Sequence, residues 1–412
     1  MKYGLIGEHL KHSFSKEIHA AIGEYEYEIL ELTPSELEPF IKAKDFLGIN
    51  VTIPYKEAVI HMLDYVDPFA LEIGAVNTVV NRNGKLCGYN TDFMGMKYLV
   101  EKTGVDVRNK KVLIVGTGGT SKTATAVVRS LGCKEIVYVS HIETPGAVSY
   151  EEMYEKHTDS PVVFNTSPVG MYPKNYNSPL DLTKFPCLEG VIDVVYNPIS
   201  TALVQSAREL GIKANGGLYM LGAQAVFASG HFFDTGVDDS LFERVFKSVL
   251  HIKDNVSLIG MPSCGKTTVG KELARLMGKK FVDTDIEIEK EIGMPIPEYF
   301  KLYGESEFRR VEREVIARVS MEGSQVIATG GGAVLFKENM RALKQNGDVY
   351  FIDRSLNLLC PTGDRPLSRD FESLKKRYEE RYPLYTSYAD VTVNGDNTVE
   401  AVAKEIYEEY LK

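Results

Sequence analysis

The stretch Gly260–Thr268, with the sequence Gly-Met-Pro-Ser-Cys-Gly-Lys-Thr-Thr, restricts the possible folds of the chain most strongly. It matches the pattern Gly-x4-Gly-Lys-Ser/Thr, follows an apolar run at 256–259 and opens a helix-patterned segment at 266–277. Glycines let the backbone wrap a phosphate, and the N–H groups at the start of the helix point toward it. The stretch therefore predicts a strand–loop–helix unit that binds a nucleoside triphosphate, with an ordinary glycine-rich turn as the alternative.

The loop side chains have separate expected roles. Lys266 adds a positive charge, and the hydroxyl of Thr267 suits Mg2+. Cys264 is interpreted as a passive small residue rather than a redox switch. The residues expected to contact ATP are Gly260, Gly265, Lys266, Thr267 and Thr268.

Length and composition limit the other possibilities. A chain of 412 residues is too long for one typical core, so we expect about two or three domains. The net charge of -10 argues against a nucleic-acid or acidic-membrane surface. No apolar run reaches the ~18 residues of a membrane span, and the start of the sequence lacks an apolar signal-peptide region. The five cysteines are scattered, which predicts a cytoplasmic protein without a disulfide framework or structural zinc site.

A second glycine turn lies in the middle of the first half. The apolar run Lys111–Val115 leads into Gly-Thr-Gly-Gly at 116–119, followed by a helical pattern and a second apolar run at 136–139. This order predicts a βαβ unit with a dinucleotide pyrophosphate at the glycine turn. An NAD-binding site usually places Asp or Glu after the second strand, but here the residues are Ser140-His-Ile142. The missing acid disfavours NAD and leaves NADP possible.

Strand runs at 162–164 and 191–195 alternate with helical patterns such as 203–210, which predicts an α/β protein with a doubly wound parallel sheet. A short polar joint at 251–255 separates this part from the triphosphate-binding part. The predicted domains are a substrate-binding lobe at 1–100 with returning helices at 220–250, a Rossmann-like lobe at 101–219, a linker at 251–255 and a P-loop α/β domain at 256–412.

Several polar residues of the first half suit either local structure or ligand binding. Ser13 and Ser15 precede a helical pattern, where serine usually caps the helix, but two hydroxyls could also hold a polyhydroxylated ligand. Lys56 follows a buried strand that ends at Pro54, where a lysine is usually a solvated surface charge. Asn77, Thr91 and Asp92 lie in or near turn sequences, so Asx-turns are their ordinary role.

The ordered motifs of residues 1–250 carry a family resemblance. They are His12-Ser-Phe-Ser15, Asn50-Val-Thr-Ile-Pro-Tyr-Lys56, Asn77-Thr78, Asn90-Thr-Asp92, Gly116-Thr-Gly-Gly119, Asn165-Thr-Ser-Pro-Val-Gly-Met171 and Met220-Leu-Gly-Ala-Gln224. In this order they resemble the shikimate dehydrogenase family, which implies NADPH-dependent reduction of 3-dehydroshikimate to shikimate. The resemblance implies Lys56 and Asp92 as the catalytic pair. It assigns substrate binding to Ser13, Ser15, Thr52, Asn77, Asp92, Tyr196 and Gln224.

The chemistry of the reduction agrees with this assignment. Hydride addition to a ketone develops negative charge on oxygen, which requires a proton donor or a cation. A lysine beside a carboxylate can donate and take back a proton. That Lys56 and Asp92 lie close in space follows from the resemblance alone.

The sequence departs from the family pattern at two places. Lys16 replaces the usual proline after the second serine, and Ser140-His-Ile142 replaces the Asn-Arg-Thr signature for the 2′-phosphate of NADP. Lys122 stands where the family commonly has an arginine near that phosphate. The hypothesis is that Lys122, with His141 or Ser140, favours NADPH with a reduced margin over NADH. The predicted dinucleotide-binding residues are Gly116, Gly118, Gly119, Thr120, Lys122, Ser140 and His141.

Residues 255–412 resemble shikimate kinase. Besides the loop at 260–268, the resemblance rests on Asp283-Thr-Asp285, Gly304-Glu-Ser-Glu-Phe-Arg-Arg310, Ala328-Thr-Gly-Gly-Gly-Ala-Val334, Arg365-Pro-Leu367 and Arg381-Tyr-Pro-Leu-Tyr385. Shikimate carries a carboxylate and hydroxyls, and an arginine fork suits a carboxylate. The implied acceptor-binding residues are Asp285, Arg309, Gly331, Gly332 and Arg381.

The resemblance also implies the catalytic roles in phosphoryl transfer. Asp285 would act as the base, and Asp283 with Thr267 would hold Mg2+. Lys266 and Arg365 would neutralise charge on the transferring phosphoryl group, since positioning and electrostatics dominate such reactions. The segment Cys360–Arg369 is interpreted as a lid that carries Arg365, with a plain surface loop as the alternative. Leu358 stands where the family often has a basic residue near adenine.

The two resemblances share one metabolite, so the sequence predicts a bifunctional enzyme that makes shikimate and then phosphorylates it. The expected partners are small-molecule substrates, with neither nucleic acid nor membrane, and the oligomeric state stays open. One alternative is a dehydrogenase half that prefers quinate. Another is a non-catalytic ligand sensor attached to an active kinase, which the retained Lys56 and Asp92 argue against.

Overall fold

The computed structural model describes residues 2–10, 13–359 and 371–412. The chain forms two compact units, Met1–Leu250 and His251–Lys412. Both units consist of β-sheets flanked by helices, so the predicted α/β fold class is confirmed. Among the described residues, no helix is both long and apolar enough to cross a membrane.

The first unit begins with a mixed sheet of strand order β2-β1-β3-β5-β6-β4. β1 pairs in parallel with β2 and β3, whereas β5 pairs antiparallel with β3 and β6. The strands are β1 (Tyr3–Gly7), β2 (Tyr27–Glu31), β3 (Gly48–Val51), β4 (Tyr65–Val66), β5 (Thr78–Arg82) and β6 (Lys85–Tyr89). The helices of this lobe are α1 (Ser15–Ile22), α2 (Pro34–Ala43), α3 (Pro68–Ile73) and the 3-10 turn η1 (Ala58–Met62).

The second sheet of this unit is parallel throughout, with the order β12-β11-β10-β7-β8-β9. Its strands are β7 (Lys111–Val115), β8 (Glu135–Val139), β9 (Ala147–Val148), β10 (Val162–Asn165), β11 (Gly190–Asp193) and β12 (Lys213–Asn215). Its helical segments are α5 (Gly119–Ser130), α6 (Tyr150–Lys156), α7 (Ala202–Glu209) and η2 (Leu182–Lys184). The order in which strands are added to the sheet reverses between β7 and β10. In such sheets, ligands bind beyond the carboxyl ends of the strands at this switch point.

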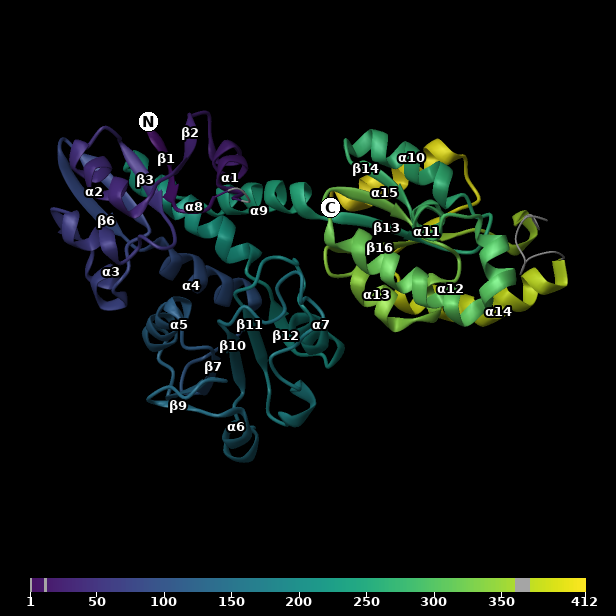
Figure 1. The fold of residues 1–412 in the computed structure, drawn as a ribbon, viewed down its shortest axis with the longest axis horizontal. Helices are drawn as coiled ribbons and strands as arrows, with labels where there is room; N and C mark the ends of the chain where they lie inside the picture. The colour runs from purple at the N-terminus through teal and green to yellow at the C-terminus, as the bar shows by residue number, and fades with distance from the viewer. Residues whose placement is uncertain (1, 11–12, 360–370) are drawn as a thin grey trace. The chain divides into compact units, whose positions relative to one another are not determined.

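Alternate residues of β7 explain why helices cover both faces of this sheet. Val112 and Ile114 pack with side chains of α5 and of α4 (Thr91–Thr103), whereas Leu113 and Val115 pack with those of α6 and α7. The long helix α8 (Leu218–Phe233) runs beside α4, as Figure 1 shows. The two helices approach closely at Gly95, where a Cβ atom would lie 2.8 Å from the carbonyl oxygen of Met220.

The second unit contains a parallel sheet with the order β14-β15-β13-β16-β17. The strands are β13 (Asn255–Ile259), β14 (Lys280–Asp283), β15 (Gln325–Ala328), β16 (Gly347–Asp353) and β17 (Val391–Asn394). The helical segments are α10 (Lys266–Met277), α11 (Thr284–Ile292), α12 (Ile296–Met321), η3 (Ala333–Leu335), α13 (Lys337–Leu343), η4 (Leu356–Leu358), α14 (Phe371–Tyr388) and α15 (Val399–Tyr410). The left-handed φ of 81° at Gly304 divides α12 into two helices at a kink.

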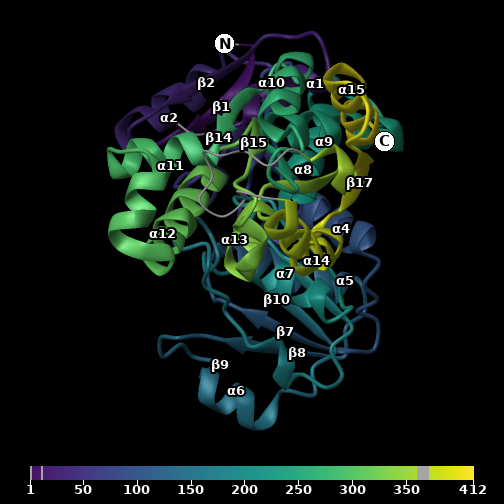
Figure 2. The same cartoon turned by 90° about the vertical axis from the view of Figure 1, so that its right-hand side faces the viewer.

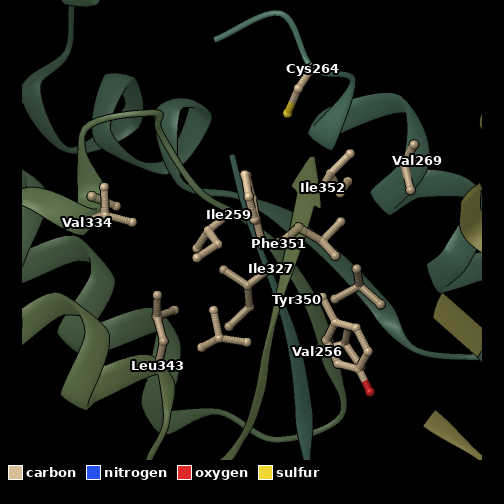
Figure 3. Packing of buried hydrophobic residues seen from close by; sticks show 14 of the residues in the cluster. Val256, Ile259, Cys264, Val269, Ile327, Val334, Leu343, Tyr350, Phe351 and Ile352 are labelled. Atoms are coloured by element: carbon tan, nitrogen blue, oxygen red, sulfur yellow. The ribbon is translucent and has the colours of Figure 1, made fainter. Parts of the chain in front are cut away.

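Helices cover both faces of this sheet as well. Figures 1 and 2 show α10 and α15 together on one face, and α12 and α13 on the other. Every residue of the central strands β13 and β15 is buried, as expected for a parallel sheet covered on both sides. Figure 3 shows part of this core, in which Val256, Ile327 and Phe351 come from three neighbouring strands.

The joint predicted at 251–255 contains little irregular chain. Helix α9 (Asp239–Lys253) includes its first residues, β13 begins at Asn255, and only Asp254 lies between them. The buried amino group of Lys279 donates to the Asp254 carboxylate and to the carbonyl oxygens of His251 and Asp254. Side-chain contacts of the second unit therefore begin before the strand that opens its sheet.

Candidate active sites

The first unit brings Lys56 and Asp92 together. Lys56 lies in the turn after β3, and Asp92 is the second residue of α4. The Nζ atom of Lys56 donates to Oδ2 of Asp92 at 2.6 Å, and the side chains are 28% and 18% exposed. The start of α4 is held by Asn90, whose side chain accepts from Phe93 N–H and donates to the carbonyl oxygen of Ala75. Local capping therefore fixes the position from which Asp92 reaches the lysine.

Asn77 joins the strands to the same helix start. Its Oδ1 atom accepts from the backbone N–H of Thr91 at 2.7 Å and from the Thr91 hydroxyl at 3.2 Å. The Asn50 side chain donates to the carbonyl oxygen of Asn77 and to the Thr78 hydroxyl. These buried amides connect β3, β5 and α4, so part of the predicted substrate-binding set also holds the site together.

A cavity of about 430 Å3 opens beside the pair. It is lined by residues of both lobes of the first unit, including Val194 and Gly217. It is lined by the predicted catalytic Lys56 and by every substrate-binding residue predicted for this half: Ser13, Ser15, Thr52, Asn77, Asp92, Tyr196 and Gln224. His9, which the sequence did not single out, lines it too. The cavity thus combines hydroxyls, amides and one lysine–carboxylate pair.

The two serines do not cap α1 with their side chains. Phe14 is the N-cap residue and has no side-chain cap bond. Instead, the Ser13 hydroxyl donates to the Ser15 hydroxyl at 3.0 Å and accepts from Ser15 N–H at 3.2 Å. His12, which belongs to the motif quoted for this loop, lies outside the described residues.

The glycine turn at 116–119 lies at the switch point between β7 and β10. Gly116 has a left-handed φ of 103°, and a Cβ atom there would lie 3.0 Å from the Thr166 hydroxyl and 3.1 Å from Ser167 N. Gly118 is the N-cap of α5, which begins at Gly119, so free N–H groups face this edge of the sheet. Thr120, predicted to bind the dinucleotide, lines the 430 Å3 cavity.

A second cavity of about 380 Å3 lies along α5. Lys122 and Arg129 line it together with hydroxyls from Thr117, Ser121 and Thr144. Lys122 also forms an exposed ion pair of 3.1 Å with Glu57 of the substrate-binding lobe.

Ser140 and His141 are not among the residues that line either cavity of the first unit. The Ser140 hydroxyl accepts from Ile142 N–H at 3.2 Å and bonds to the Thr144 hydroxyl, and His141 is exposed. The Ser140 hydroxyl therefore stabilises the turn in which it lies.

The stretch Gly260–Thr268 follows β13 and leads into α10, as expected for the predicted strand–loop–helix unit. Gly265 has a left-handed φ of 98°, which an L side chain rarely adopts. The largely buried Lys266 donates to the carbonyl oxygens of Gly260 and Met261, both at 2.9 Å. Gly265, Lys266, Thr267 and Thr268 line a cavity of about 190 Å3.

Two acidic residues border this small cavity. Asp283 ends β14 and accepts from the Thr267 hydroxyl at 2.7 Å through Oδ2. Its Oδ1 atom accepts from Asp285 N–H at 3.0 Å, which makes Asp283 the N-cap of α11. Asp285 is within the first turn and lines both this cavity and a larger one. The phosphate loop and the predicted base therefore line two cavities that share Asp285.

The larger cavity has a volume of about 590 Å3, and all predicted acceptor-binding residues line it: Asp285, Arg309, Gly331, Gly332 and Arg381. Arg309 lies flat against Gly332, where a Cβ atom would meet its guanidinium at 2.3 Å. The Arg381 guanidinium donates to the carbonyl oxygen of Gly331 at 2.9 Å. The two glycines thus leave room that a larger residue would fill.

Sequence reasoning missed Glu312, which also lines the larger cavity. Its Oε2 atom accepts from Arg309 at 2.8 Å, and its side chain is 1% exposed. Burial raises the pKa of Glu312, while the Arg309 guanidinium acts in the opposite direction. The spacing of three residues on one helix was a usable signal, since such residues face the same side. Arg365 and the proposed lid at 360–369 lie outside the described residues.

Family comparisons match both halves of the chain. A model described as shikimate dehydrogenase substrate binding domain matches residues 5–79, and one described as shikimate kinase matches residues 262–411. A curated shikimate dehydrogenase (NADP(+)) of Caldanaerobacter subterraneus subsp. tengcongensis is 36% identical over 59% of this chain and 95% of its own length.

Solved structures resemble the first unit. The shikimate 5-dehydrogenase of Thermus thermophilus in complex with NADP(H) and shikimate is 28% identical, with a TM-score of 0.53, over 60% of this chain and 99% of that one. The quinate dehydrogenase of Corynebacterium glutamicum in complex with NAD is 27% identical, with a TM-score of 0.53, over 61% and 98%. The chain therefore belongs to the shikimate dehydrogenase family through its first unit and carries a shikimate kinase domain in its second.

Proposed function

We infer that this chain catalyses two consecutive reactions, the reduction of 3-dehydroshikimate to shikimate and the phosphorylation of shikimate to shikimate 3-phosphate. The observation that carries this inference is that one chain contains cavities lined by the residues predicted for both reactions. One cavity contains the Lys56–Asp92 pair, and two cavities that share Asp285 border the phosphate loop and Arg309. The product of the first reaction is the acceptor of the second.

For the reduction, we propose Lys56 as the proton donor. NADPH supplies the hydride when it is bound. Negative charge then develops on the carbonyl oxygen, and Nζ of Lys56 gives that oxygen its proton. Asp92 accepts from this ammonium group at 2.6 Å and orients it. The hydroxyls of Ser13 and Ser15 and the amides of Asn77 and Gln224 bind the carboxylate and hydroxyls of the substrate.

The cavity along α5 supports NADPH rather than NADH as the cofactor. Its cationic side chains, Lys122 and Arg129, suit a 2′-phosphate, and the glycine turn at 116–119 suits the pyrophosphate. The hydroxyl of Ser140 is used within its own turn, so we assign more of the preference to Lys122 than to Ser140. Comparison of kcat/KM for NADPH and NADH tests this, and an NADH preference would disprove it.

For the phosphorylation, we propose Asp285 as the base that accepts the proton of the shikimate hydroxyl. Arg309 and Arg381 bind the substrate carboxylate against Gly331 and Gly332. Lys266 neutralises negative charge on the phosphoryl group that ATP supplies. Arg365 is proposed for the same role on the basis of its motif.

The described residues fit a magnesium ion of the usual kinase type. Mg2+ keeps several waters and is held through one or two protein side chains plus substrate phosphates. Thr267 and Asp283 offer such a pair, and no cluster of three or more metal-binding side chains is found within the described residues. When bound, Mg2+ supplies positive charge at the phosphates.

The four described cysteines are free, which supports our proposal that the enzyme works in the reducing cytoplasm.

Quinate is a second candidate for the dehydrogenase half, because the fold neighbours include a quinate dehydrogenase. The deciding experiment measures NADPH oxidation with 3-dehydroshikimate and ADP formation with shikimate, each alone, and the reverse reaction with quinate. We expect both forward activities and a kcat/KM for quinate far below that for shikimate. Comparable values would favour the quinate assignment, and absence of any turnover in the first half would favour a ligand sensor.

A further inference from the structure

Asp193 is a buried carboxylate that the proposed reduction does not use. It is the last residue of β11, and its register partner on β10 is Asn165, also the last residue of its strand. Asn165, Asp193 and Thr201 are each 0% exposed. An ionisable group without access to solvent is costly unless it is hydrogen-bonded, so its partners define what it does.

The carboxylate of Asp193 receives three hydrogen bonds. Its Oδ1 atom accepts from Asn165 Nδ2 at 2.9 Å and from Val195 N at 3.0 Å. Its Oδ2 atom accepts from the Thr201 hydroxyl at 2.6 Å. Asp193 therefore connects the chain that follows β10 with the chain that follows β11.

The first of these chain segments borders the glycine turn. Asn165 Oδ1 accepts from the N–H and the hydroxyl of Ser167, and Thr166 donates its hydroxyl to the carbonyl oxygen of Val115. Thr166 and Ser167 pack against Gly116 at the start of the proposed pyrophosphate site. Movement of Asn165 would therefore shift Thr166 and Ser167, which border the proposed pyrophosphate site.

The second chain segment borders the substrate cavity. Val194 and Tyr196 line it, and Gly217, which lines it too, packs on the carbonyl oxygen of Val194. Thr201 closes the segment, because its hydroxyl accepts from Val204 N–H as the N-cap of α7. Asp193 holds both ends of this segment, one through Val195 N and the other through Thr201.

We propose that Asp193 is a positioning residue of the dehydrogenase half, which sets the cofactor-side segment at 165–169 and the substrate-side segment at 194–201 relative to each other. This rests on the proposed reduction of 3-dehydroshikimate. A carboxylate suits this role because its two oxygens can accept from both sides at once. Asparagine can nearly replace it, since its oxygen keeps the bonds from Asn165 and Val195, and the Thr201 hydroxyl can turn to accept from the new amide.

The two sides can be separated with single substitutions in the full chain. Loss of one hydrogen bond corresponds to about a tenfold change in affinity. Thr201→Val should raise KM for 3-dehydroshikimate about tenfold and leave the Kd for NADPH, measured by nucleotide fluorescence, within about twofold. Asn165→Ala should raise the Kd for NADPH about tenfold and leave KM for 3-dehydroshikimate within about twofold. Asp193→Ala should raise both constants, and Asp193→Asn should recover most of the loss.

A purely structural Asp193 would give a different result. Thr201→Val and Asn165→Ala would then lower the unfolding temperature while KM and Kd stay at wild-type values, and this outcome overturns the proposal even if Asp193→Ala fails to fold. Equal effects of both variants on both ligands would overturn the two-sided assignment. If wild-type enzyme does not turn over 3-dehydroshikimate, the proposed function fails, whereas the Kd of Asn165→Ala for NADPH still tests the cofactor side.

Discussion

Nζ of Lys56 lies 2.6 Å from Oδ2 of Asp92, although the two residues are 36 positions apart. The turn after β3 supplies the lysine, and the capped start of α4 supplies the carboxylate. The two residues are already in hydrogen-bonding contact, so the proposed proton donor and its partner are assembled within the predicted substrate-binding lobe.

Removal of the proposed proton donor, Lys56, should abolish most of the reduction. Lys56→Met is expected to lower kcat for NADPH oxidation by about 10²–10⁴-fold, because general acid catalysis contributes roughly that much. Kinase activity of the same protein should be unchanged. Lys42→Met, at an exposed lysine on α2, is the matched control and should match the wild type. Full NADPH oxidation by Lys56→Met would remove Lys56 from the mechanism.

Arg309 and Arg310 provide a matched pair in the kinase half. Arg309 is nearly buried in the larger cavity, whereas Arg310 is exposed and pairs with Glu307 and Glu314. Arg309→Lys keeps the charge but loses the planar fork, so KM for shikimate should rise by about 10- to 100-fold. Arg310→Lys should leave KM unchanged. Steady-state ADP formation measures both, and equal effects would place the carboxylate elsewhere.

The buried pair of Asp254 and Lys279 should stabilise the second unit. The Lys279 side chain is 0% exposed and that of Asp254 is 8% exposed. Asp254→Asn leaves a buried ammonium without its counter-charge, which should lower the free energy of unfolding by about 3–5 kcal/mol. Glu322→Gln is the control, because Glu322 pairs with Lys280 at the surface, where such pairs contribute about 0–1 kcal/mol. Urea unfolding followed by loss of kinase activity compares the two variants, and similar midpoints would contradict the prediction.

Acid should weaken the first unit through His19. Burial lowers the pKa of His19 to about 3, against 6.5 as the ordinary value. The unfolded chain therefore binds a proton below pH 6.5 that the folded chain does not, so stability present above pH 6.5 is lost as pH falls toward 3. The slope attributable to His19 should approach about 1.4 kcal/mol per pH unit.

The variant His19→Gln isolates this contribution. Burial raises the pKa of Asp193 to about 7, which acts in the opposite direction, so the quantity to compare is the difference between wild type and variant at each pH. Thermal unfolding between about pH 7 and about pH 4.5 should show this difference shrinking or reversing as pH falls. His61→Gln, at an exposed position, is the control. Parallel curves for wild type and His19→Gln would contradict the prediction.

Local chemistry explains which features could be predicted from the sequence. The glycine turns at 116–119 and 260–265 require left-handed or crowded backbone that the residue types themselves reveal. The alternation of apolar runs and helical patterns likewise predicts the parallel sheet at 111–215, whereas the antiparallel pairs of β5 in the first sheet were not predicted. The residues predicted to bind substrate in both halves came from ordered motifs, and they line two cavities in the structure.

Features that depend on tertiary contacts were not readable in this way. The approach of Lys56 to Asp92, the burial of Glu312 and the bonds of Asp193 all arise from elements distant in sequence or from burial. For Ser140 the residue type was misleading. Its hydroxyl could bind a ligand, but in the structure it forms hydrogen bonds within its own turn. The joint at 251–255 reads as a polar linker, yet Asp254 pairs with a buried lysine.

The most direct test of two consecutive reactions in one chain supplies 3-dehydroshikimate as the sole acceptor, with NADPH and Mg-ATP, and follows NADPH loss and ADP formation together. We predict that ADP forms only when NADPH is present, that Lys56→Ala abolishes both signals, and that Asp285→Ala abolishes ADP formation alone. ADP formation without NADPH, or full NADPH oxidation by Lys56→Ala, would contradict the account.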